Sequence, residues 1–167
     1  PDALHGSDAQ KDGWFGVWLQ GKDPAKPWEF RALSCPGKGG TNLDGADLNG
    51  DGKMDLVGSE GHGVGLWSFL APDYKAARVD DTLKSTHFVA LADFNGDRSV
   101  DIASCGYESK KVTCFLNDGK GVFQPFVVDT NQCAYDGSAV DLDRDGDMDL
   151  LLAGQNSTNV VWYENLR

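Results

Sequence analysis

The fold is decided by one stretch, Asp93-Phe94-Asn95-Gly96-Asp97-Arg98-Ser99-Val100-Asp101-Ile102. The same alternation of acidic and apolar residues begins at Asp47 and at Asp141, so the starts are 46 residues apart (47 to 93) and then 48 (93 to 141). A period of about 45 residues is typical of four-stranded propeller blades and of helical repeats. The apolar runs that flank each stretch are short and bounded by Gly and Asp, which favours strands. The sequence therefore predicts an all-β repeat protein.

Each repeat is expected to form four strands, named A to D in chain order. In the second unit these are residues 88–92, 101–105, 112–116 and 123–128, with a hairpin turn at 117–120. The prediction is a β-propeller of four-stranded antiparallel blades, in one partial domain over residues 1–167. The units are expected at about residues 1–33 (strands B to D), 41–79, 86–129 and 135–166 (strands A to C).

These units amount to about three and a half blades, whereas propellers have roughly four to eight. The chain is therefore expected to be half of a seven-bladed ring, a fragment of a longer chain, or a protomer whose open blades another copy or segment completes. Internal closure, with an N-terminal strand completing the last blade, is the alternative. Bare strand edges would otherwise invite aggregation.

The composition excludes some classes of partner. The chain has 22 Asp, only 4 Glu and 21 Gly, and its net charge is −11. A chain that acidic lacks the basic patches that bind nucleic acid or an anionic membrane surface. No apolar run approaches the ~20 residues that span a bilayer. Asp and Gly favour turns and oxygen-rich metal loops.

The acidic stretches place side-chain oxygens at positions 1, 3, 5 and 9, and a backbone carbonyl at position 7. Calcium takes six to eight oxygen ligands of these kinds. An EF-hand is excluded, because position 12 is not Glu and strands flank the loop. Solvated acidic turns would explain one such loop, but three with one pattern favour about three Ca²⁺ ions. The predicted ligands are Asp47, Asn49, Asp51, Lys53 (carbonyl) and Asp55; Asp93, Asn95, Asp97, Ser99 (carbonyl) and Asp101; and Asp141, Asp143, Asp145, Asp147 (carbonyl) and Asp149.

These motifs, with the closing Val161-Trp162-Tyr163-Glu164-Asn165, resemble the FG-GAP/VCBS repeats, the integrin-α-like calcium-binding propeller repeats. The resemblance covers nearly the whole chain. It implies a β-propeller with calcium in the A–B loops. It does not imply one function, because the family serves adhesion, glycan binding and scaffolding and accompanies some polysaccharide-degrading enzymes.

The cysteines bear on the compartment. Cys105 and Cys114 flank the B–C turn of the second unit and are expected to face each other and form a disulfide, and Cys35 is a candidate partner for Cys133. Disulfides and weak calcium loops suit a secreted or cell-surface protein, and four reduced thiols in a cytosolic protein are the alternative. Asn156 begins a glycosylation sequon.

Ligand recognition is expected on the face opposite the acidic loops, with Trp28, His62, Tyr107 and Tyr135 as candidates. No catalytic constellation is visible, so the first hypothesis is a non-catalytic extracellular module that binds a glycan or a protein, or assembles with further copies. The second is the propeller portion of a secreted carbohydrate-active enzyme such as a polysaccharide lyase. A lyase needs a His or Tyr base and a basic group for an acidic sugar, and Lys and Arg are few here.

Overall fold

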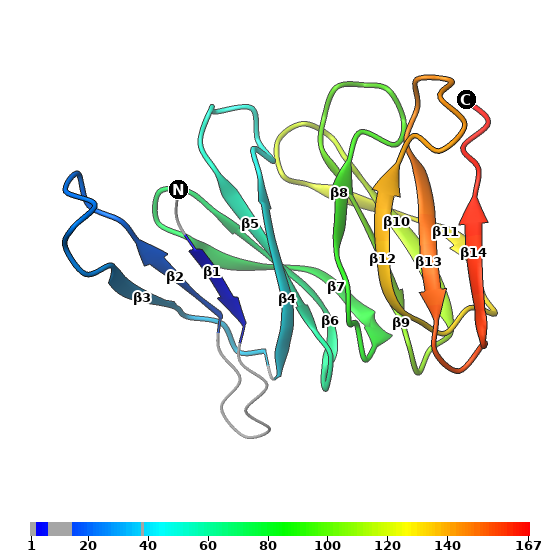
Figure 1. The fold of residues 1–167 in the computed structure, drawn as a ribbon, viewed down its shortest axis with the longest axis horizontal. Helices are drawn as coiled ribbons and strands as arrows, with labels where there is room; N and C mark the ends of the chain where they lie inside the picture. Colours follow the sequence, from blue (N-terminus) through cyan, green and yellow to red (C-terminus); the bar gives the residue numbers. More distant parts are fainter. Residues whose placement is uncertain (1–2, 7–14, 38) are drawn as a thin grey trace.

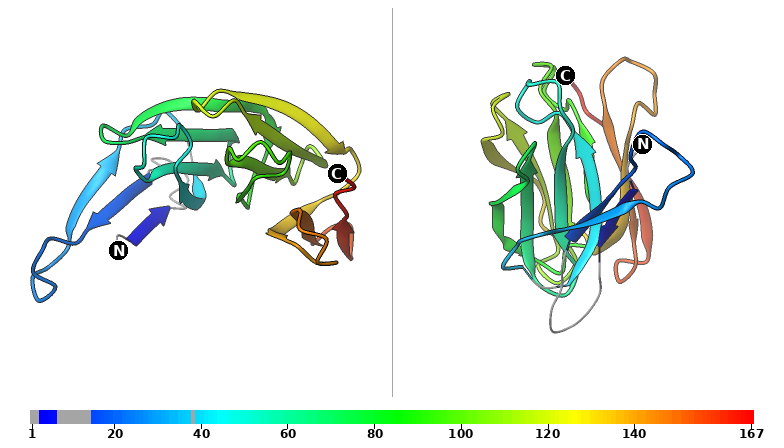
Figure 2. Two further views of the ribbon diagram at one scale, coloured as in Figure 1. Left: turned by 90° about the horizontal axis from the view of Figure 1, so that it is seen from above. Right: turned by 90° about the vertical axis from the view of Figure 1, so that its left-hand side faces the viewer.

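The computed structural model describes residues 3–6, 15–37 and 39–167, which form fourteen strands and no helix. The strands make four antiparallel sheets that stand side by side along a curved row (Figures 1 and 2). The expected all-β, antiparallel architecture is confirmed, and the sheets are consistent with propeller blades. Parts of the first predicted unit, residues 1–2 and 7–14, lie outside the described residues.

The two middle sheets have four strands each, and each strand pairs with its neighbour in the chain. The second sheet consists of β4 (Gly40–Ala46), β5 (Asp55–Glu60), β6 (Val64–Leu70) and β7 (Lys75–Lys84). The third consists of β8 (Ala90–Ala92), β9 (Asp101–Gly106), β10 (Lys111–Asn117) and β11 (Phe123–Asp129). The bounds of the four strands of this third sheet agree to within two residues with the strands predicted at 88–92, 101–105, 112–116 and 123–128.

The two outer sheets have three described strands each. The first contains β1 (Ala3–Gly6), β2 (Phe15–Leu19) and β3 (Glu29–Leu33). The fourth contains β12 (Ala134–Val140), β13 (Asp149–Gly154) and β14 (Asn159–Tyr163). The first sheet corresponds to the unit predicted with strands B, C and D, and the fourth sheet corresponds to the unit predicted with strands A, B and C.

Burial along the strands explains why they form. All six residues of β5 and of β9 are buried, because these strands lie inside their sheets and are covered on both faces. Their sequences, DLVGSE and DIASCG, combine a few apolar residues with small ones such as Gly and Ser, which allow close packing of neighbouring sheets. The edge strand β11 is mostly exposed. The predicted hairpin between β10 and β11 is present, with Gly119 at φ 76°, a conformation that glycine adopts without strain.

Three apolar cores hold the row together, one between each pair of neighbouring sheets. The first surrounds Phe15 and Phe69, the second Leu66 and Ile102, and the third Phe88 with Leu152. Of the three Trp residues that recur on strand C, Trp67 is buried in the first core, whereas Trp18 and Trp162 are about two-fifths exposed (40% and 41%). Inter-sheet packing therefore accounts for Trp67 alone.

Strand direction places two sets of loops at opposite edges of the row. Because successive strands run antiparallel, the loops after β4, β8 and β12 reach one edge of the row, at the top of Figure 1. The turns after β5, β9 and β13 reach the opposite edge. The acidic loops thus lie on one face and the short B–C turns on the other. No described segment forms a helix suited to crossing a membrane.

Candidate functional site

The three acidic loops share one backbone conformation. Position 6 has a left-handed φ in every loop, at Gly52 (79°), Arg98 (72°) and Gly146 (99°). Arg98 therefore adopts the glycine-like conformation in spite of its side chain, which costs on the order of 1 kcal/mol. The second loop therefore makes the same turn as the first and third loops.

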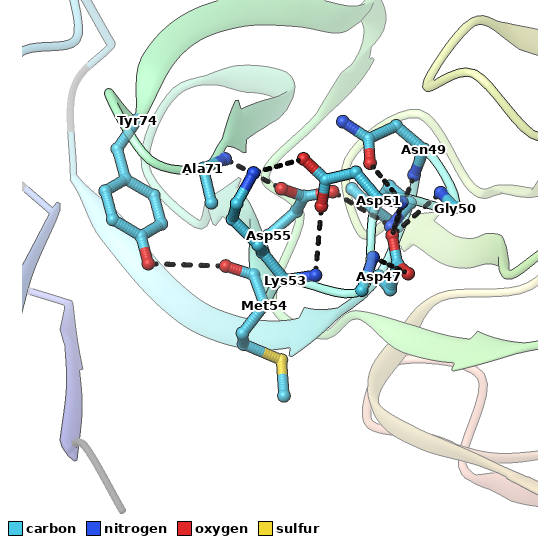
Figure 3. A network of polar contacts seen from close by, with 11 residues as sticks. Asp47, Asn49, Gly50, Asp51, Lys53, Met54, Asp55, Ala71 and Tyr74 are labelled. Atoms are coloured by element: carbon cyan, nitrogen blue, oxygen red, sulfur yellow. Dashed lines mark hydrogen bonds and ion pairs between the residues drawn. The ribbon is translucent and has the colours of Figure 1, made fainter.

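The first acidic residue of the first loop is wrapped by backbone amides (Figure 3). Asp47 Oδ2 accepts a hydrogen bond from Gly52 N at 2.8 Å, and Oδ1 accepts one from Gly50 N at 2.8 Å. These N–H groups, with that of Gly52 contributing most, hold the pKa of Asp47 below its ordinary value. Asp51 accepts from the backbone N–H of Lys53 and pairs with its ammonium at 2.9 Å. This loop thus carries ionised carboxylates at neutral pH.

The second loop repeats this arrangement. Asp93 Oδ1 accepts from Gly96 N at 2.6 Å and Oδ2 from Arg98 N at 2.8 Å. Asn95 Oδ1 accepts from the backbone N–H of Asp97, just as Asn49 accepts from Asp51 in the first loop. The shared pattern of position 1 and position 3 acceptors explains why these two loops have the same residues, Asp and Asn, at positions 1 and 3.

The third loop gathers its carboxylates instead. Among the described His, Cys, Asp and Glu side chains, only here do three, Asp141, Asp143 and Asp145, bring ligand atoms within 4.8 Å of one another. Within the described chain, Asp141 Oδ1 and Asp147 Oδ1 are buried without a hydrogen-bond partner. Orphaned carboxylate oxygens are costly, and a hard cation would satisfy them. The donor set fits calcium.

The aspartate at position 9 makes hydrogen bonds that the predicted ligand pattern does not reveal. Asp101 is fully buried, and its carboxylate accepts from Phe94 N at 3.0 Å and from Asn117 N at 2.8 Å. Burial raises the pKa of this carboxyl. Asp55 and Asp149 make the equivalent pairs of bonds. Each of these three residues therefore fastens its acidic loop to the turn that follows strand C.

Two asparagines extend this connection to the neighbouring sheet. Asn117 Nδ2 donates to Leu48 O at 2.8 Å, and Asn165 Nδ2 donates to Phe94 O at 2.9 Å, so each reaches the acidic loop of the preceding sheet. Sequence reasoning gave neither residue a role in joining neighbouring sheets, although Asn165 belongs to the closing motif and residue 117 to the predicted hairpin turn. Their signal was available, because Asn117 and Asn165 stand 48 residues apart (117 to 165), which is the repeat period.

The predicted disulfides are wrong. All four cysteines are free thiols in the structure. Cys105 lies opposite Val112, and Cys114 lies opposite Ala103, because the β9–β10 turn is longer than the expected two residues. The Cys105 thiol instead donates to Gln132 O at 3.2 Å. The proposed pairing of Cys35 with Cys133 is not formed either.

The buried thiols should react slowly. Burial raises the pKa of Cys35 and of Cys105 to about 11 and that of Cys114 to about 12, and the reactive species is the thiolate. We expect a thiol-disulfide reagent at pH 8 to modify the folded protein slowly and, after unfolding in guanidinium, to titrate four thiols per chain. A count of two or none in the unfolded, unreduced protein would contradict the free-thiol state.

Four aromatic rings meet on the face opposite the acidic loops. His87 stacks on Tyr135, with ring centroids 4.1 Å apart and planes 19° apart. Tyr107 stands edge-on to both rings, and His62 stands edge-on to His87. These four residues, the aromatic cluster, come from the second, third and fourth sheets. Three of the four predicted ligand-binding candidates thus lie together.

The other candidates lie elsewhere. Trp28 is in the β2–β3 connection, which by strand direction lies on the face of the acidic loops, so its predicted place opposite them is wrong. Asn156 is exposed in the β13–β14 turn. His87, the centre of the cluster, was not predicted, although it precedes Tyr135 by one repeat period, from residue 87 to 135.

Comparison with known proteins agrees with this architecture. The FG-GAP-like repeat matches residues 93–152, from the first acidic residue of the second loop into β13. A search of curated proteins finds no significant match. The chain is thus an all-β protein of antiparallel, blade-like sheets. Its segment 93–152 is similar to the FG-GAP-like repeat, which supports the resemblance drawn from the sequence over that part of the chain.

Proposed function

We propose that this chain is an extracellular, calcium-stabilised repeat module that binds a glycan or a protein, or assembles with further copies, and has no catalytic activity of its own. The observation that carries the proposal is the all-oxygen cluster of Asp141, Asp143 and Asp145, whose ligand pattern recurs in the other two loops. Calcium is the cation that such hard, oxygen-only sites favour. About three ions would change the formal charge from −11 to −5 (−11 + 6).

The role of calcium in this proposal is structural. In each loop the side chains at positions 1, 3, 5 and 9 and the carbonyl at position 7 would hold the ion, with the residues given above. The bound charge would relieve the repulsion among crowded carboxylates. Weak loops of this kind are filled at the millimolar calcium concentrations found outside cells. An extracellular location therefore rests on the loops, and the free thiols lend it no support.

We further propose that the sheets are blades of a propeller, about three and a half in number. Among the described strands, β1 pairs only with β2, and β14 pairs only with β13. In the two middle sheets, the strand equivalent to β1 also pairs with a preceding strand, and the strand equivalent to β14 also pairs with a following strand. Further copies or segments that pair with these edges would complete either a seven-bladed ring or an assembly.

Two aspartates in the second loop separate calcium binding from folding. Asp93→Ala removes a proposed ligand whose amide partners lie near solvent, so we expect about 2.7 kcal/mol less stability when calcium is at a hundredfold excess over Kd, and little change in chelator. Asp101→Ala strands two buried N–H groups and is expected to cost about 2–4 kcal/mol even in chelator, and more in calcium because it also removes a proposed ligand. Urea unfolding with calcium and with chelator measures both. Equal losses for Asp93→Ala in the two conditions would argue against a metal site.

One observation favours the second candidate function, a polysaccharide lyase. The aromatic cluster brings His87 within ring contact of Tyr107 and Tyr135, and such side chains serve as proton acceptors and donors in elimination reactions. The backbone of a basic residue, Lys84, contacts the turn that carries Tyr107. Turnover of a polyuronate that is lost in Tyr107→Phe and Tyr135→Phe would establish this candidate in place of the non-catalytic module.

A further inference from the structure

We propose that the aromatic cluster is a binding site for neutral oligosaccharides, an inference that rests on the binding function proposed above and names its site and ligand class. The rings combine apolar faces with polar edges, the Tyr hydroxyls and the His nitrogens. A pyranose ring has the complementary surfaces, a face of C–H groups and a rim of hydroxyls. Binding sites for small molecules use the same combination of aromatic walls with a few polar groups.

The cluster presents an exposed and well-oriented ring. Tyr135 is 48% exposed although one of its faces stacks on His87 at 4.1 Å. Tyr107 lies edge-on to Tyr135 at 6.1 Å and to His87 at 5.9 Å, so the Tyr135 ring is held from two directions. A ring that is already fixed loses little conformational entropy when a ligand stacks on its free face.

Position in the fold indicates the length of the ligand. His62 follows β5 of the second sheet, Tyr107 follows β9 of the third, and Tyr135 lies in β12 of the fourth. The cluster therefore crosses two boundaries between sheets. A ligand that lies across it contacts elements from three repeats, which suits a short polymer better than a single sugar.

The charges around the cluster favour a neutral ligand. Glu108 and Lys110 share the turn with Tyr107, Asp136 follows Tyr135, and Lys84 adjoins the same turn. These two acidic and two basic residues balance one another, while the whole chain carries −11. A polyuronate would meet this net negative field without a local excess of cations.

The test uses the full chain in calcium, with cellotetraose, mannotetraose and xylotetraose as neutral probes and tetragalacturonate as the acidic one. Calorimetry is expected to show millimolar or tighter binding of at least one neutral probe. Tyr135→Ala should weaken it at least about tenfold, as expected for the loss of one stacking ring. Tyr135→Phe, which keeps the ring, should retain it. Phe30→Ala removes an exposed ring that contacts Trp18, away from the cluster, and should leave binding unchanged.

Proton NMR of the wild-type chain gives a readout that does not depend on the variants folding: ring resonances of Tyr135 and His87 should shift when the neutral probe is added. Failure of all three neutral probes, binding of tetragalacturonate alone, or unshifted ring resonances would overturn the proposal. So would equal binding by a folded Tyr135→Ala variant. Calcium-dependent melting, measured on the same samples, shows separately whether the calcium-stabilised module stands.

Discussion

Removal of calcium by a chelator is expected to lower the melting temperature by about 15–30 °C. Each of three sites contributes about 2.7 kcal/mol at a hundredfold excess of calcium over Kd, which gives about 8 kcal/mol in total. In a domain of this size each kcal/mol corresponds to about 2–4 °C. Calorimetric or fluorescence melting, in calcium and in chelator, measures the shift, and re-addition of calcium should reverse it.

Magnesium provides the control for this experiment. It is smaller, keeps its own water ligands and demands octahedral geometry, so it should restore much less of the lost stability than calcium does. Sodium chloride at equal ionic strength should restore little, because screening acts on exposed charges without supplying ligands. Identical melting temperatures in calcium and in chelator would contradict the calcium proposal for all three loops.

Asn117→Ala is expected to destabilise the protein by about 3–4 kcal/mol in calcium and in chelator alike. The side chain is 3% exposed, and its amide donates to the carbonyls of Leu48 and Val100 at 2.8 and 2.9 Å. Its Oδ1 accepts from the N–H groups of Gly119 and Gly121, both at 3.1 Å. Truncation leaves several backbone groups without partners, and each buried one costs about 1–3 kcal/mol. Urea unfolding measures the change.

The neighbouring residue offers a matched control. Asp118 lies in the same turn and also accepts two backbone N–H groups, from Lys120 and Val122, but it is exposed to solvent. Water can replace its bonds, so Asp118→Ala should cost less than about 1 kcal/mol. If the two variants lose the same stability, the connection that Asn117 makes to the preceding sheet has no energetic role.

The sequence predicted the repeating parts of this structure well, because the same pattern occurs three times and each copy supports the interpretation of the others. The strands predicted between residues 88 and 128 were placed to within two residues, and the three acidic loops share a left-handed turn at position 6. The sequence-based prediction failed where the length of a turn decides which residues face each other across two strands. The β9–β10 turn is two residues longer than expected, which moves Cys114 out of register with Cys105. Strand alternation alone could not reveal that difference.

The aromatic cluster shows the other limit. His62, Tyr107 and Tyr135 were chosen for their place on one face, but their mutual contacts depend on how far neighbouring sheets turn relative to each other. The angle between neighbouring sheets depends on packing in the three apolar cores, each of which combines residues from two repeats. The sequence of a single repeat therefore does not determine it. His87 escaped notice because the equivalent position in the preceding repeat is Thr41, which has no ring.

The segment that matches the FG-GAP-like repeat is out of phase with the sheets. It starts after β8 has ended and finishes inside β13, so it takes three strands from one sheet and its last strands from the next. The matched segment therefore spans the boundary between two of the predicted units, 86–129 and 135–166, and includes the connection between their sheets. Duplication of such a segment lengthens the row while linking the new sheet covalently to both neighbours. An array that grew in this way carries, inside every duplicated segment, one complete connection from a sheet to its neighbour.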